Sequence, residues 1–154
     1  MLQVRQIEDS RLRADICEAV MRALPDWFGN ESATLSYINK AKSQPFFAAY
    51  SEDTPVGFVY LHIHNQYTAE LCCMGVLMEH HRRGAGRLLI NAAEGYCRAL
   101  GLRFLTVKTL ADSHPDEGYG KTRKFYLAMG FLPLEVFPDL WGAENPCLLM
   151  AKGL

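Results

Sequence analysis

The sequence predicts a mixed α/β fold, in which a mainly antiparallel central sheet is flanked by helices. One observation is the polar turn at residues 51–55, which joins two apolar segments as a hairpin and makes those strands antiparallel. Another is a glycine-rich turn at residues 81–87, which leads from an apolar strand into the helical pattern of residues 88–100. Because a helical crossover connects parallel strands, the strand that follows, at residues 103–110, is expected to pair in parallel with the strand before the turn.

Apolar periodicity and cap residues predict the individual elements in chain order. Strands are expected at residues 2–7, 46–50, 56–64, 68–76, 103–110, 131–137 and 147–152. Helices are expected at residues 10–24, 34–42 and 88–100, and in a segment through Tyr126 that ends at Gly130. Asp9 or Ser10 caps the first helix and Pro25 stops it, while Ser32 is expected to start the second. Residues 111–118 form a polar loop.

Length and composition predict one domain over residues 1–154. With 154 residues, 49% of them hydrophobic, the chain can bury about two-thirds of its unfolded surface without staples. The net charge of −1 argues against nucleic acid and membrane surfaces as partners, because the basic residues cluster locally. The absence of a signal-like start and of a long apolar run makes the cytoplasm the expected location.

The cysteines and histidines do not show the spacing of a metal site. The cysteines are five in number and lack Cys-x-x-Cys spacing, so we expect reduced thiols rather than disulfides or a zinc site. Cys72 and Cys73 are interpreted as strand packing residues. His62 and His64 have no third ligand at a recognisable spacing, so they are interpreted as pocket-wall or surface residues that contact an acceptor.

The glycine-rich turn has the chemistry of a pyrophosphate site. It reads His81-Arg82-Arg83-Gly84-Ala85-Gly86-Arg87 and opens a helix, so backbone N–H groups and the positive end of the helix dipole meet an array of cationic side chains. Glycine at these positions lets a ligand approach the backbone. The alternative is an ordinary tight turn whose arginines are solvated.

Two other phosphate-binding motifs fit this turn poorly. A P-loop has Lys followed by Ser or Thr after its last glycine, whereas this chain has Arg87 and Leu88. A dinucleotide fingerprint needs a small third residue where Leu89 stands.

The turn resembles the acetyl-CoA loop of the Gcn5-related N-acetyltransferase (GNAT) superfamily, which is written Gln/Arg-x-x-Gly-x-Gly/Ala. That pattern falls on residues 81–86, after a strand that ends at Val76, and departs from it at His81, which can still donate to a phosphate or a turn carbonyl. A second block, at residues 124–131, is similar to the Phe/Leu-Tyr-x-x-x-Gly-Phe helix of the same family. The resemblance covers about residues 45–154.

The resemblance implies a fold, a donor and a set of site residues. In this family the strand ending at Val76 and the next one splay apart, and the gap between them is the active site. Acetyl-CoA is then the expected acyl donor, and Tyr126 the expected general acid for the departing thiolate. The backbone around Gly75 is expected to stabilise the oxyanion. The expected cofactor-binding residues are Gly75, Val76, His81, Arg82, Arg83, Gly84, Ala85, Gly86 and Arg87, without a metal.

Glu70 is the candidate general base. It lies six residues before Val76, the position of the base glutamate in some histone-modifying relatives, and strand alternation places it on the face of Cys72, Met74 and Val76. The alternative is a solvent-facing carboxylate at the start of a strand.

Three functions are compatible with these features. The first is direct acetyl transfer from acetyl-CoA to an amine of a small molecule or a peptide. The second is a catalytically silent CoA-binding sensor, and the third is a nucleotide-phosphate binder that does not use CoA. Residues 132–142 are rich in proline and aromatic groups, and form either an acceptor wall, a core-covering loop or a homodimer contact.

Overall fold

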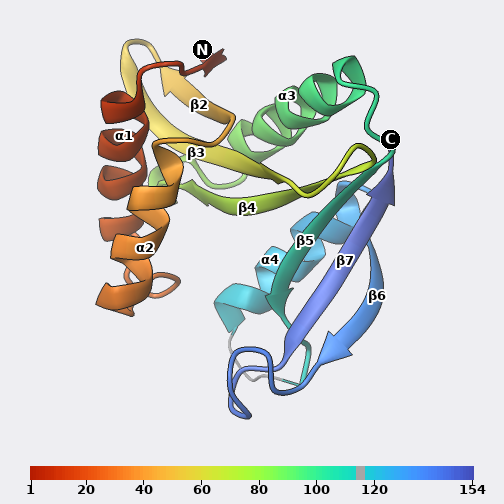
Figure 1. Cartoon of the computed structure of the whole chain (residues 1–154). Helices are drawn as coiled ribbons and strands as arrows, with labels where there is room; N and C mark the ends of the chain where they lie inside the picture. The colour runs from red at the N-terminus through yellow and green to blue at the C-terminus, as the bar shows by residue number, and fades with distance from the viewer. Residues whose placement is uncertain (114–116) are drawn as a thin grey trace. The chain divides into compact units, whose positions relative to one another are not determined.

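The computed structural model describes residues 1–113 and 117–154, with only the backbone of Glu117 (Figure 1). Its helices are α1 Ser10–Arg22, α2 Glu31–Ala41, the 3-10 turn η1 Met78–His80, α3 Ala85–Ala99 and α4 Glu117–Ala128. Its strands are β1 Leu2–Gln6, β2 Phe46–Ser51, β3 Thr54–Ile63, β4 Thr68–Val76, β5 Phe104–Leu110, β6 Leu132–Phe137 and β7 Cys147–Gly153. The strand order is β1-β2-β3-β4-β5-β7-β6.

The pairing directions confirm the mixed, mainly antiparallel sheet. The pairs β1/β2, β2/β3, β5/β7 and β6/β7 are antiparallel. The pair β4/β5 is parallel, with registered partners from Thr68↔Phe104 to Leu71↔Val107. The helix α3 lies between these two strands in the chain, as a parallel crossover requires. The expected splay of their later residues stays a prediction.

The predicted helix starts are half right. Asp9 caps α1 as expected, because its Oδ1 accepts the N–H of Leu12 at 2.8 Å. The second helix begins at Glu31 and not at Ser32, since Asn30 is its cap and accepts the N–H of Ala33 at 3.0 Å. Asparagine and serine are equally good caps, so the sequence offered two eligible starts and the prediction chose the wrong one.

The chain forms two compact units, Met1–His62 with Cys72–Tyr96, and Ile63–Leu71 with Cys97–Leu154. In the first unit, one face of the strands packs under α1 and α2. Members of this core include Cys17, Val20, Met21, Phe46, Phe58, Tyr60 and Cys73. The opposite face meets α3, where the rings of Phe47 and Tyr96 are 5.6 Å apart. The strands β2 and β3 of this unit are therefore covered on both faces.

Gly75 is tightly enclosed by this core. A Cβ built on it would lie 3.0 Å from Val20 Cγ1, and 3.3 Å from both Leu24 Cδ1 and Phe58 Cε1. Close-packed interiors resist even one added methyl group. The packing of α1 on β4 thus explains the glycine at position 75, for which the family resemblance implied only oxyanion stabilisation and cofactor binding.

The second unit holds α4 against the end of β5. Arg123 Nη1 donates to the carbonyl oxygens of Leu110 at 2.7 Å and Ala111 at 3.1 Å. The polar loop expected at residues 111–118 ends earlier than predicted, because α4 begins at Glu117, and residues 114–116 lie outside the described part of the chain. In the described residues, no helix has the length and apolar character needed to cross a membrane.

Replacing Gly75 by alanine should destabilise the protein by about 1–3 kcal/mol, because the new Cβ overlaps Val20 and its neighbours. Gly95→Ala is the matched control: Gly95 lies inside α3, and a Cβ there meets nothing within 4 Å. This control should stabilise by up to about 1 kcal/mol. Urea unfolding measures both, and equal stabilities would contradict the packing argument.

Candidate functional site

The predicted glycine-rich turn is the start of α3. Arg82 has φ 61° and Gly84 has φ 89°, so the chain reverses direction at these positions before Ala85 begins the helix. The Gly84 carbonyl accepts the N–H of Leu88 at 3.1 Å, which is the first helical hydrogen bond. Helix geometry leaves the N–H groups of residues 85–87 without acceptors inside the helix. The turn therefore has the backbone arrangement of an anion site.

His81 fastens this turn to the end of β4. Its Nε2 lies 2.6 Å from the carbonyl oxygen of Val76, and since a carbonyl only accepts, Nε2 carries the proton and donates it. Its ring meets that of Trp27 edge-on, with centroids 5.8 Å apart. The side chain thus donates to a carbonyl of the preceding strand, whereas the sequence predicted a phosphate or a carbonyl of the turn as its acceptor.

The arginines of the turn point their charge at solvent. Arg82, Arg83 and Arg87 are exposed, whereas Ala85 is buried and anchors the helix start. In the part of the chain that the structure describes, no carboxylate lies within ion-pairing distance of these arginines. Their charge is thus available to an anionic ligand, and it acts in concert with the helix dipole.

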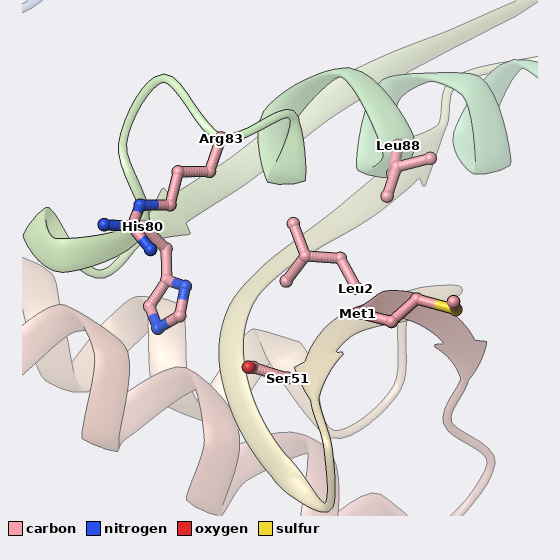
Figure 2. A pocket seen from close by; sticks show the side chains of 6 residues that line it. All are labelled: Met1, Leu2, Ser51, His80, Arg83 and Leu88. Carbon is pink, nitrogen blue, oxygen red and sulfur yellow. The ribbon is translucent and has the colours of Figure 1, made fainter.

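A cavity of about 420 Å³ opens beside the turn. It is lined by Met1, Leu2, Ser51, His80, Arg83 and Leu88. Figure 2 shows Arg83 and His80 on the loop side of this cavity, and Leu88 of α3 facing Leu2. One wall is thus polar and cationic and the other apolar, an arrangement that suits a ligand with both apolar and anionic parts.

Tyr126 is positioned by the way α4 ends. The N–H of Phe131 donates to the Tyr126 carbonyl at 3.0 Å and that of Gly130 to the Leu127 carbonyl at 3.0 Å, while Gly130 has φ 96°. These are the bonds of a Schellman motif, with glycine in its left-handed position. The rings of Tyr126 and Phe131 meet edge-on with centroids 5.7 Å apart. The Tyr-x-x-x-Gly-Phe spacing is therefore also a helix-ending pattern.

A cation strengthens the same helix end. Lys152 Nζ on β7 donates to the Met129 carbonyl at 2.6 Å and lies 5.6 Å from the centroid of the Phe131 ring. A positive charge at a helix C-terminus is stabilising. Tyr126, which is 8% exposed, is therefore a buried residue near a helix end that several contacts hold in place.

Glu70 on β4 binds two partners that the sequence did not predict for it. Its Oε1 lies 2.7 Å from His64 Nε2 and 3.3 Å from Lys108 Nζ. Glu70 pairs with Thr106 across the parallel strands, and Lys108 lies two residues further along β5, on the same face. The side chain of Glu70 is only 13% exposed, so it is not the solvent-facing carboxylate of the alternative interpretation. The register of β4 against β5 would have predicted the contact between Glu70 and Lys108, but the sequence alone does not determine this register.

The cysteine environments are those of packing residues. Burial raises the pKa of the Cys73 thiol, and a hydrogen bond with Cys17 raises it further, so the thiol stays protonated. Cys147 is buried on β7, and burial likewise raises the pKa of its thiol, while Lys108 lowers it and Glu70 raises it. The described residues contain no group of three side chains suited to a metal ion.

Comparison with known proteins places this architecture among acetyltransferases. The family model of the acetyltransferase (GNAT) family matches residues 6–131. No curated protein matches the sequence. A GNAT-family protein from Desulfovibrio desulfuricans has a similar structure, with a TM-score of 0.82 at 18% identity, over 99% of both chains.

Two enzymes of known substrate share the fold. One is an aminoglycoside 6'-N-acetyltransferase complexed with coenzyme A, with a TM-score of 0.78 at 17% identity, covering 98% of this chain and 96% of that one. The other is the ribosomal-protein-S18-alanine N-acetyltransferase from Escherichia coli, with a TM-score of 0.76 at 16% identity, covering 99% and 94%. With the family model matching residues 6–131, which contain both the glycine-rich turn and the Tyr126 block, this chain belongs to the acetyltransferase (GNAT) family.

Proposed function

We propose that the chain is a single N-acetyltransferase domain that moves an acetyl group from acetyl-CoA directly to an amine of a small molecule or peptide. The observation that carries this proposal is the start of α3, where free helix N–H groups meet three exposed arginines, Arg82, Arg83 and Arg87. Acetyl-CoA presents a pyrophosphate and a further phosphate to such a site. A similar fold holds coenzyme A in an N-acetyltransferase from Thermoplasma acidophilum, at 16% identity.

The first unit supplies the donor-binding residues. The backbone of Gly84, Ala85, Gly86 and Arg87 binds the pyrophosphate, and the arginines neutralise its charge. His81 keeps the turn on the end of β4 through its bond to Val76. The backbone N–H groups around Gly75 and Val76 stabilise the developing oxyanion of the thioester.

Tyr126 in the second unit is the proposed proton donor, and Glu70 in the same unit is proposed to assist removal of a proton from the acceptor. Tyr126 gives its phenolic proton to the departing thiolate as the C–S bond breaks. Glu70 supports removal of the proton from the acceptor ammonium, since an amine attacks only in its neutral form. Transfer needs no enzyme-bound acyl group, and Cys72 and Cys73 take no part. Transfer of the acetyl group to an amine distinguishes the proposed enzyme from a catalytically silent CoA-binding sensor.

The acceptor is proposed to be a primary amine, and the protein to work in the cytoplasm. Solved relatives of this fold act on an aminoglycoside and on a ribosomal protein's alanine. The exposed apolar side chains of the segment 132–142 include Leu132, Leu134, Leu140 and Trp141. These side chains suit either an acceptor wall or contact with a second copy of the chain.

Calorimetric titration with acetyl-CoA tests the donor assignment without knowledge of the acceptor. We expect micromolar binding of acetyl-CoA and much weaker binding of ATP and NAD. Release of free thiol is then followed with kanamycin, spermidine and a peptide that begins with alanine. A folded protein that does not bind acetyl-CoA would exclude the transferase and the CoA sensor together, while binding without turnover on any amine would favour the sensor.

Gly84→Leu should weaken acetyl-CoA binding by roughly tenfold or more, about 1.4 kcal/mol, because a side chain intrudes where the ligand meets the turn and disfavours φ 89°. Gly142→Leu is the matched control. Gly142 has φ 94° and, as at Gly84, a Cβ there meets nothing within 4 Å. Both variants should lose similar stability, but only Gly84→Leu should lose affinity. Equal affinities in calorimetry would refute the turn as the pyrophosphate site.

Tyr126→Phe should lower kcat by about 100-fold while the Kd for acetyl-CoA changes little, because the ring packing on Phe131 is kept and only the acidic hydroxyl is removed. Tyr50→Phe, at another buried tyrosine, is the control and should leave kcat unchanged. Steady-state kinetics with the acceptor found above decides the matter. An unchanged kcat for Tyr126→Phe would remove this residue from the mechanism.

A further inference from the structure

We propose that His64 is the group that takes the proton from the acceptor ammonium, and that Glu70 is the positioning residue that orients it. The inference rests on the proposed transferase function and identifies the side chain that acts as the base in that reaction. It comes from the cluster of His64, Glu70 and Lys108 in the second unit. In this cluster the Oε1 atom of Glu70 is within hydrogen-bond distance of both the His64 ring and the Lys108 ammonium.

The backbone around His64 is held in place from several directions. The N–H of His64 donates to the Thr68 carbonyl at 2.9 Å. Asn65 Oδ1 accepts the N–H groups of Tyr67 at 2.8 Å and Thr68 at 3.0 Å, which closes the turn between β3 and β4. The Tyr67 carbonyl in turn accepts the N–H of Arg103 at 2.7 Å. His64 therefore stands on a fixed turn next to β5.

The contact with Glu70 selects one tautomer of the His64 ring. An ionised carboxylate only accepts hydrogen bonds, so Nε2, at 2.7 Å, is the nitrogen that carries the proton. In the neutral ring Nδ1 then holds the basic lone pair. A carboxylate that orients a histidine also stabilises the imidazolium formed when that lone pair takes a proton.

Glu70 itself is poorly placed to act as the base. Its Oε1 already accepts from the His64 ring and lies 3.3 Å from the Lys108 ammonium, so protonating it would break an ion pair. Its side chain is 13% exposed, whereas that of His64 is 38% exposed. The imidazole is the more accessible of the two to an incoming amine.

Among the described residues, this cluster includes titratable groups from three strands. Glu70 lies on β4 and Lys108 on β5. Cys147 on β7 is close enough for both to influence the pKa of its thiol, which burial raises, so it stays neutral. Among the described residues, the cluster thus places the Glu70 carboxylate against the His64 ring and the Lys108 ammonium against that carboxylate.

The proton balance of the reaction is complete with these groups. An alkylammonium gives one proton to His64 Nδ1, which later releases it to water. The neutral nitrogen forms the C–N bond to the acetyl carbon as the C–S bond breaks. The nitrogen loses its second proton to solvent, the thiolate gains one from Tyr126, and the Tyr126 phenolate regains a proton from solvent. The products are an N-acetyl amide and free CoA, with one proton released to solvent.

His64→Gln should lower kcat/KM at pH 7 by about 100-fold with the best alkylamine from the acceptor screen. With methoxyamine, which is already neutral at this pH, the loss should stay within about threefold, since general-base help is not needed. Added imidazole should restore part of the alkylamine activity, and the deficit should shrink as pH rises and neutralises the amine. A structural role for His64 would show none of these differences.

Glu70→Gln should follow the same pattern with a smaller loss, because it removes the orienting carboxylate and leaves the imidazole. Glu144→Gln, an exposed carboxamide control in the same unit, should behave as the unchanged protein. Calorimetry should give all variants the same Kd for acetyl-CoA. If His64→Gln keeps its activity within threefold at every pH while Glu70→Gln loses it, Glu70 is the base and the inference is overturned.

A nuclear magnetic resonance measurement tests the pair without any acceptor. Long-range proton–nitrogen spectra of labelled protein should show the Nε2–H tautomer of His64, and Glu70→Gln should reduce that preference. An Nδ1–H tautomer in the unchanged protein would refute the inference. A failure of the unchanged protein to acetylate any amine would count against the proposed function instead, since this spectrum does not depend on turnover.

Discussion

The reversal of the chain at Arg82 and Gly84 is the constraint on which the rest of the site depends. Left-handed backbone at these positions lets the chain leave β4 and enter α3 within a few residues. The same reversal leads into the first turn of α3, whose N–H groups have no acceptors inside the helix, and the exposed arginines of the turn add their charge. His81 secures the geometry by donating to the Val76 carbonyl, so the candidate anion site is built before any ligand arrives.

A helix end also places the candidate acid. Gly130 ends α4 in a Schellman motif, and the bond from Phe131 to the Tyr126 carbonyl fixes the turn that carries the phenol. Lys152 adds a cation at that end. The proposed donor site thus lies at the positive start of one helix and the candidate acid at the negative end of another, two positions where backbone groups lack helical partners.

Glu70 shows how context changes the role of a residue type. As an isolated strand carboxylate it reads as a base, but the structure surrounds it with a histidine and an ammonium. A carboxylate with two such donors serves better to orient and to balance charge than to take up a proton. The basic group of the pair is then the more exposed imidazole of His64. The cavity beside Arg83 likewise combines two kinds of side chain, since a polar, cationic wall faces an apolar one.

The sequence by itself determined the elements, the mixed sheet and both family motifs, because these depend on periodicity, caps and glycines that act over a few residues. It predicted the turn at Gly84 and the helix stop at Gly130 for that reason. Only the tertiary structure decided that Lys108 meets Glu70, since this contact needs the parallel register of β4 and β5. It likewise decided that Gly75 serves the packing of α1, because close contacts across elements leave no local signature in the sequence.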